Sequence, residues 1–296
     1  MAKRIVLFLV TNLAVVLTVS IVLSVLGVGR YVGPGGLDLG ALAIFCFAWG
    51  MGGAFISLQI SRWSAKRMMG VQLVDGRTGH EELDWLHVTV ERLTRQAGLP
   101  MPEVGYYDSP EVNAFATGPS RSRALVAVST GLLRGMRRDE VEGVLAHEVA
   151  HIANGDMVTM TLIQGVMNAF VMFLSRLIAY AIANRGRDDD ERHSQGNYFL
   201  VMILEMVLGI LGSLITAWFS RQREFRADAG GAMLAGRARM VGALRRLQAN
   251  QHLIDPGQPS LATMKISDQP SRFAALFSTH PPLETRIAAL ERADIR

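Results

Sequence analysis

Four long apolar stretches divide the chain, and each has the roughly 20 mostly apolar residues that a helix needs to cross a membrane. The first follows Lys3 and Arg4 as the apolar part of a signal peptide would, but it is longer than usual and lacks a clean cleavage site, so we predict an uncleaved anchor. A short loop with Gly and Pro follows it, which predicts a hairpin of the first two stretches. The stretches are Ile5 to Val28, Leu39 to Ile60, Met157 to Ala183 and Tyr198 to Phe219.

The third and fourth stretches each contain one charged residue, Arg176 and Glu205 respectively. Charges inside a membrane are costly and usually face other helices or a partner charge. The two residues could therefore pair with each other, or these helices could pack partly against protein. Whether this second pair crosses the membrane fully stays open at this point.

The two more polar segments, 61–156 and 220–296, are long enough together for one domain with its own core. Alternating and clustered apolar residues predict short strands in the first segment, and a stripe of leucines and valines predicts a helix from Glu81 to Ala97. The second segment reads as mainly helical. The strand candidates are Val71 to Val74, Glu103 to Tyr107, Asn113 to Thr117 and Ala124 to Ser129.

We therefore predict a mainly α membrane protein that combines transmembrane helices with an α+β domain. Its parts are a hairpin (1–60), the first half of the domain (61–156), a second pair of apolar helices (157–219) and the second half of the domain (220–296). Lys and Arg flank the ends of the apolar stretches on the side of both domain halves. Because such residues are retained on the inner side, we expect the domain to face the cytoplasm and to lie against the lipid bilayer.

Composition agrees with a membrane protein and narrows the possible chemistry. Half of the residues are hydrophobic, only 19% are charged, and the net charge is +4. Such a small, scattered positive charge does not indicate a nucleic-acid partner. The only cysteine, Cys46, lies in an apolar stretch, which excludes an internal disulfide and a zinc site built from several cysteines. A metal site in this chain would need His and carboxylate ligands.

Residues 147–151 read His-Glu-Val-Ala-His and supply such ligands. Side chains four positions apart share one face of a helix, so His147 and His151 can bind one Zn²⁺ while Glu148 acts as a general base. The surrounding sequence independently predicts a helix. We expect Asp139 and Glu142 to form a capping box at its start and Gly155 to end it.

A catalytic zinc site has three protein ligands and one open position, and the local helix supplies only two ligands. The best candidate for the third is Glu224, shortly after the fourth stretch. Asp228 lies four residues further along, on the same helix face, and could accept the N–H of a ligand imidazole. From spacing alone, an exposed helix face rich in Glu, Arg and Asp remains a possible interpretation of this segment.

Two other functions compete with a protease whose site lies outside the bilayer. An intramembrane metalloprotease of the site-2 type also carries this histidine motif, but the charges of residues 137–142 disfavour a spanning helix here. A membrane scaffold or transporter with a regulatory zinc site would account for Arg176 and Glu205. Nothing in that second function requires Glu148, whereas peptide hydrolysis does.

The chain resembles the HtpX-type membrane peptidases of bacteria, which belong with the CAAX-processing zinc proteases. The resemblance covers nearly the whole sequence, including the N-terminal hairpin. The matching segments are Asn113-Ala114-Phe115-Ala116-Thr117, Leu145-Ala146-His147 through Gly155-Asp156-Met157, Arg223-Glu224-Phe225 with Ala227-Asp228, and Thr279-His280-Pro281-Pro282-Leu283.

This resemblance implies a zincin-like catalytic domain with one Zn²⁺ per subunit, Glu224 as the third ligand and Asp228 behind it. It places His280 near the active site, where it would stabilise the transition state. It also implies that an edge strand formed by Asn113, Ala114, Phe115 and Ala116 binds the substrate backbone. The expected activity is hydrolysis of peptide bonds in misfolded or damaged membrane proteins, at the bacterial inner membrane and under stress.

Overall fold

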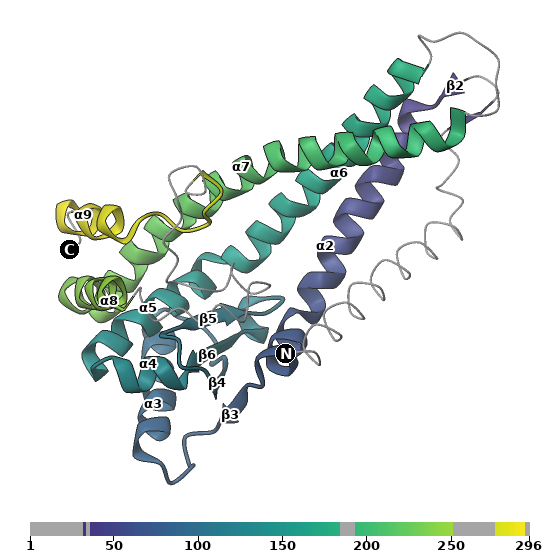
Figure 1. The fold of residues 1–296 in the computed structure, drawn as a ribbon. Coiled ribbons are helices and arrows are strands. Elements are labelled where there is room, and N and C mark those ends of the chain that lie inside the picture. The colour runs from purple at the N-terminus through teal and green to yellow at the C-terminus, as the bar shows by residue number, and fades with distance from the viewer. Residues whose placement is uncertain (1–31, 34–35, 184–192, 251–275, 294–296) are drawn as a thin grey trace. The chain divides into compact units, whose positions relative to one another are not determined.

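The structure is a computed structural model, and it describes residues 32–33, 36–183, 193–250 and 276–293 (Figure 1). The chain forms two compact units. The helix unit consists of Ile5–Ser57 and Met160–Thr216, and the sheet unit includes Leu58–Thr159 and Ala217–Arg296. The first predicted membrane stretch, Ile5 to Val28, lies outside the described residues, so the hairpin stays a prediction.

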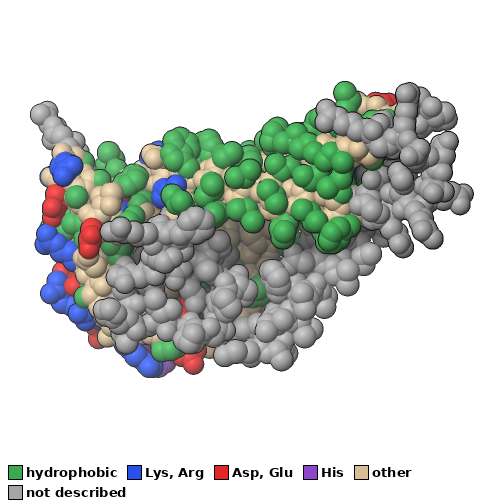
Figure 2. Space-filling model, turned by 45° about the horizontal axis from the view of Figure 1, so that its top comes forward, with side chains coloured by type: hydrophobic (Ala, Val, Ile, Leu, Met, Phe, Trp, Pro, Cys, Tyr) green, Lys and Arg blue, Asp and Glu red, His purple; other side chains and the backbone are tan. Residues whose placement is uncertain are grey.

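Among the residues that the structure describes, three helices are long and apolar enough to cross a membrane. They are α2 (Leu39–Met69), α6 (Asp156–Ala183) and α7 (His193–Ala235), and two short strands, β1 (Val32–Gly33) and β2 (Gly36–Leu37), precede α2. Large apolar side chains such as Phe170, Met206 and Leu211 are exposed on α6 and α7, and green hydrophobic side chains line the visible face of these helices in Figure 2. A surface of this kind is suited to lipid rather than to water.

Small residues and the ion pair of Arg176 with Glu205 hold the described helices of the helix unit together. A Cβ atom added to Gly50 of α2 would lie 2.7 Å from backbone atoms of Gly165 and Ala169 in α6, so the two backbones touch. Close contact through small residues is typical of helices packed in a membrane. Arg176 of α6 and Glu205 of α7 pair at 2.5 Å, as the sequence had suggested they could.

The sheet unit is built on a four-stranded sheet with the order β3-β4-β6-β5. Strand β4 pairs with β6 in parallel, and the other two pairings are antiparallel. All four predicted strands are present, with small shifts at their ends. Their bounds are β3 Gln72–Val74, β4 Glu103–Tyr107, β5 Ala114–Thr117 and β6 Leu125–Ser129. Strand β5 therefore lies at one edge of the sheet.

Alternation along the strands gives the sheet two buried faces. Val104, Val126 and Val128 lie in one hydrophobic cluster with α3 (Glu81–Gln96) and α5 (Arg138–Asn154). Leu125 and Ala127 point the other way and pack with Ala65 and Met69, at the end of α2. The sheet is thus covered on both sides, which fixes the position of α5 against it.

The remaining helices of the sheet unit are shorter. A 3₁₀ turn at Arg121–Arg123 precedes β6, and α4 (Thr130–Gly135) follows it. After the long helix α7 come α8 (Arg237–Ala249) and α9 (Leu283–Arg292), which pack against each other. Helix α8 also packs along α5, so α5 lies between the sheet and the C-terminal helices.

The predicted capping of α5 is correct at one end and wrong at the other. Gly155 ends the helix in the left-handed conformation, with φ 70°. At the start, however, the capping box is formed by Arg137 and Glu140 rather than by Asp139 and Glu142. The Glu140 carboxylate accepts the Arg137 backbone N–H at 2.8 Å, whereas Glu142 pairs with Arg92 at 2.9 Å. The first turn holds two acidic residues, and the helix begins two residues earlier than we predicted.

Candidate metal centre

A close contact between α5 and the last turns of α7 positions the residues of the site. A Cβ atom added to Gly231 would lie 3.0 Å from the backbone nitrogen of His147, and one on Gly230 would lie 2.9 Å from Cβ of Ala150. Only glycine at these positions lets the two helix backbones approach so closely. Because α7 crosses α5 at His147, the residues one or two turns before this glycine pair face the same imidazole.

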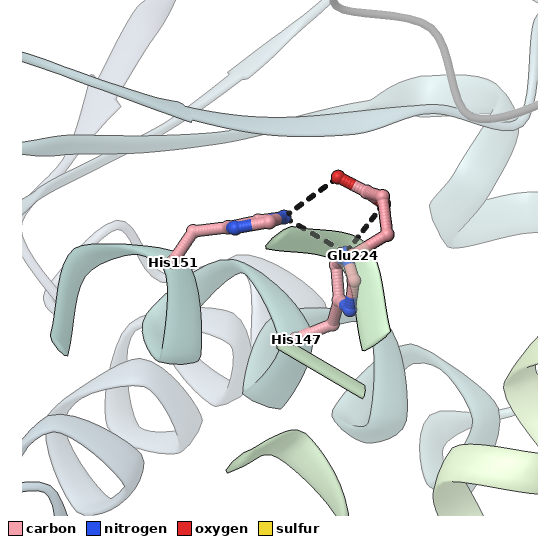
Figure 3. Close-up of side chains that lie close together, drawn as sticks. All are labelled: His147, His151 and Glu224. Carbon is pink, nitrogen blue, oxygen red and sulfur yellow. Dashed lines mark hydrogen bonds and ion pairs between the residues drawn. The ribbon is translucent and has the colours of Figure 1, made fainter. Parts of the chain in front are cut away.

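Helix α5 and α7 bring the three predicted ligands together (Figure 3). Nε2 of His147 lies 3.0 Å from Nε2 of His151. The Glu224 carboxylate faces both rings, with Oε2 3.4 Å from His147 Nε2 and Oε1 3.4 Å from His151 Nε2. All three side chains are buried, and Glu224 is completely so. Spacing alone had left an exposed helix face as an alternative for Glu224, and the structure excludes it.

This arrangement fits a zinc ion. Two imidazole nitrogens at about 2.0–2.1 Å from a tetrahedral ion stand about 3.3 Å apart, which is close to the three separations described. Two His nitrogens and one carboxylate oxygen form a donor set found in catalytic zinc sites. The buried Glu224 carboxylate would in addition offset the charge of a bound cation.

Each histidine has a carboxylate behind it. Nδ1 of His147 lies 3.0 Å from Oδ1 of Asp228, and Nδ1 of His151 lies 2.6 Å from Oδ2 of Asp156. A carboxylate at Nδ1 holds the N–H there and leaves Nε2 free to bind a metal. The sequence had suggested this contact for Asp228 but had not singled out Asp156. Burial lowers the pKa of His147, but Asp228 and Glu224 outweigh it and raise that pKa to about 9, so these carboxylates attract positive charge to the ring.

Two residues of the C-terminal segment complete the surroundings of Glu224. His280, which the resemblance had placed near the site, has Nδ1 2.8 Å from Oε2 of Glu224. Arg286 of α9 contacts Asp228 through two hydrogen bonds and lies 3.4 Å from Oε2 of Glu224. We had not identified Arg286 from the sequence. The signal was its position on the apolar stripe of α9, between Leu283, Ile287 and Leu290, which are all buried.

Glu148 follows His147 on α5 and is 5% exposed. The motif helix is a buried element of the sheet unit, and it is not among the three described helices that could cross a membrane. This position disfavours the intramembrane type of metalloprotease, in which the same motif lies in a spanning helix.

The predicted substrate-binding residues lie at the sheet edge next to α5. Asn113 directly precedes β5, and β5 packs against α5. The backbone carbonyl of Asn113 accepts the Ser129 N–H, and its backbone N–H donates to Ser129 Oγ. Its side chain donates to the hydroxyl of Tyr107 at 2.8 Å. Asn113 is therefore bound inward, and Ala114, Phe115 and Ala116 form the edge itself.

Comparisons with known proteins identify relatives over nearly the whole chain. Residues 80–294 match the model of Peptidase family M48. A protein named Protease HtpX homolog from Nitrosomonas europaea is 53% identical over 99% of this chain and 100% of its own length. Protease HtpX from Acinetobacter baumannii is 49% identical over 98% of this chain and 99% of its own.

A solved structure supports the fold independently. The crystal structure of S. mikatae Ste24p superposes with a TM-score of 0.64, covering 98% of this chain and 67% of that one. The sequences are only 17% identical, so this likeness concerns the fold alone. The fold is thus shared across a large sequence distance.

Proposed function

Because this chain belongs to peptidase family M48, whose members use zinc, we propose that His147, His151 and Glu224 hold its zinc ion and that Glu148 is its general base. The chain is a membrane zinc metalloprotease, and its substrates are proteins or peptides. The observation that carries the residue assignment is the convergence of three buried ligand atoms, all within 4.8 Å of one another, from two separate helices.

The mechanism assigns a task to each residue around the scissile bond. When bound, zinc lowers the pKa of a water molecule to about 7 and polarises the scissile carbonyl. Glu148 takes a proton from the attacking water and passes it to the leaving amine, so it serves first as base and then as acid. His280 is near enough to the ligand cluster to donate a hydrogen bond to the developing oxyanion.

Asp228 and Asp156 act on the ligands rather than on the substrate. Each accepts the Nδ1–H of one histidine, which fixes the ring and directs Nε2 toward the metal. Burial of the ligands and of Glu148 keeps bulk water away and strengthens these interactions. The scaffold or transporter alternative leaves a buried Glu148 without a task, which is why it is not favoured.

We propose that β5 binds the substrate as an added strand. Residues of an antiparallel strand alternate between pairing with their neighbour and facing away from it. Since Asn113 pairs with Ser129, the backbone groups of Ala114 and Ala116 point away from β6, toward the outer side of the edge strand. A substrate held mainly by its backbone explains tolerance of many sequences.

The biological substrates that best fit these features are misfolded or damaged membrane proteins. Asp156 lies on α6 and Glu224 on α7, and both helices are long and apolar enough to cross a membrane. Cleavage would therefore take place near the bilayer surface. Lys66 and Arg67 in the last turn of α2 support a cytoplasmic position of the site, at the inner membrane of a bacterium. We propose a part in quality control of membrane proteins under stress, with lipid as the surrounding partner and no nucleic acid.

The test uses the full chain in detergent, with zinc content and cleavage of unfolded casein measured side by side. Glu148→Gln should keep the zinc and lose cleavage, because it removes the base and leaves the ligands intact. Glu224→Ala should lose both. Retained cleavage in the first variant would remove Glu148 as the base, and an unchanged zinc content in the second would mean that another residue is the third ligand.

A further inference from the structure

Arg286 is a charged side chain at the centre of the sheet unit. It is 1% exposed and lies on the inner face of α9. Burying a guanidinium group costs several kcal/mol unless its hydrogen bonds and charge are compensated. A helix that needed only to pack on α8 would carry an apolar residue at this position, so the arginine requires a specific explanation.

Its first partner is Asp228, to which it donates two hydrogen bonds. Nε donates to Oδ2 at 2.8 Å and Nη2 donates to Oδ1 at 2.6 Å. Oδ1 is also the oxygen that faces Nδ1 of His147 at 3.0 Å. A two-bond contact of this kind fixes the plane of a carboxylate, which a single bond does not. The orientation of Asp228, and through it that of the His147 ring, therefore depends on Arg286.

Its second partner is a metal ligand. Nη1 of Arg286 points toward Oε2 of Glu224 at 3.4 Å, and within the described part of the chain this nitrogen has no hydrogen bond. Burial lowers the pKa of Arg286, but Asp228 and Glu224 outweigh it, and the group remains a cation. Nη2 also lies 3.4 Å from Nδ1 of His147. One guanidinium thus contacts two of the three proposed ligands, Glu224 directly and His147 both directly and through Asp228.

We propose that Arg286 is a positioning residue of the metal centre, which sets the orientation of His147 through Asp228 and that of the Glu224 carboxylate directly. The proposal rests on the ligand assignment given above. Helix α9 then has a task beyond packing, because it delivers the group that organises a centre whose ligands lie on α5 and α7. Removal of the guanidinium should weaken zinc binding even where the fold is retained.

The test compares Arg286→Met and Arg286→Lys with Arg292→Met, a matched control on an exposed position of the same helix. Zinc dissociation constants are measured in detergent by competition with a chelator. Loss of a residue that orients a metal ligand typically weakens binding about 10- to 100-fold. We expect a loss of this size for Arg286→Met. Arg286→Lys should bind zinc with an affinity between those of Arg286→Met and the parent, because an ammonium group cannot form the two parallel bonds. The control should bind zinc as the parent does.

Two further measurements separate positioning from simple loss of stability. In the cobalt-substituted protein, the visible absorption spectrum reports ligand geometry, and it should change in Arg286→Lys but not in Arg292→Met. If Arg286→Met does not fold, the double variant Asp228→Asn with Arg286→Met removes both charges and avoids an unpaired buried carboxylate. This double variant should fold and still bind zinc weakly.

Zinc affinities within about twofold of the parent in Arg286→Lys and the double variant, with an unchanged cobalt spectrum, would overturn the proposal. That outcome differs from failure of the ligand assignment itself. If the ligand assignment were wrong, Glu224→Ala would keep its zinc, and zinc binding by the parent would not depend on the proposed ligands.

Discussion

Nδ1 of His151 lies 2.6 Å from Oδ2 of Asp156, although the two residues belong to different helices. Asp156 is the first residue of α6, and Gly155 between the helices turns the chain so that the carboxylate returns to the ring. Asp156 is 2% exposed. The apolar helix α6 therefore begins with a carboxylate that contacts the ring of a proposed metal ligand.

The first prediction concerns this carboxylate. Asp156→Asn keeps the size of the side chain but replaces a charged acceptor with a neutral amide, so the Nδ1–H of His151 is held less firmly. We expect zinc affinity to fall about 10- to 100-fold. Chelator competition measures the effect. Asp139→Asn, on the exposed first turn of the same helix α5, is the control and should leave the affinity unchanged. Equal affinities in both variants would show that Asp156 has no influence on the metal.

The second prediction concerns the turn itself. Gly155 has φ 70°, a conformation that side chains with a Cβ atom rarely adopt, so Gly155→Ala should destabilise the protein by roughly 1 kcal/mol or more. The same change at Gly242, inside α8 with no atom within 4 Å of the new methyl group, should stabilise it by roughly 0.5–1 kcal/mol. Thermal unfolding in detergent compares the two. Shifts of the same sign would contradict the role of the left-handed turn.

The sequence predicted local structure well and the surroundings of the site only in part. Helical spacing brought His147 and His151 to one face, and Gly155 marked the end of their helix. Both follow from geometry within a few residues. The start of that helix was predicted wrongly because several acidic residues compete there, and only the fold shows that Glu142 is taken by Arg92.

Contacts between distant segments needed the structure. Periodicity places Arg286 on the buried face of α9 but does not say which element that face meets. It meets Asp228, 58 residues away. Likewise, nothing in the sequence distinguishes Gly230 and Gly231 from other small residues. The structure shows that they allow α7 to pack closely against α5. Sequence patterns report which side of an element is buried, whereas the partner on that side is a property of the whole fold.

A third prediction follows from the edge strand. If the backbone groups of Ala114 and Ala116 bind substrate, methylation of individual peptide nitrogens in a substrate should impair cleavage at alternate positions only. Each lost hydrogen bond is worth about 0.5–1.5 kcal/mol, so kcat/KM should fall roughly 2- to 10-fold at each sensitive position. A series of singly methylated peptides measures this, and methylation far from the scissile bond is the control. A uniform or absent effect along the peptide would exclude strand addition.

The last prediction tests the environment of the helix unit through Arg176 and Glu205, which pair at 2.5 Å between α6 and α7. In a membrane, Arg176→Met leaves a carboxylate without its partner in an apolar medium, at a cost on the order of 2.5–3.5 kcal/mol. In water, breaking such a pair would cost less than about 1 kcal/mol. The apparent midpoint of thermal unfolding, measured in lipid nanodiscs, should therefore fall clearly for the single variant.

The double variant Arg176→Met with Glu205→Leu removes both charges and should recover most of the lost stability, because apolar replacements of a buried pair are often neutral. Arg245→Met provides the comparison in the sheet unit, where Arg245 pairs with Glu291 at 2.8 Å and both side chains are about half exposed. The Arg245→Met change should lower the stability only slightly. If Arg176→Met cost no more than Arg245→Met, the pair would lie in water, and α6 and α7 would not cross the membrane at this level.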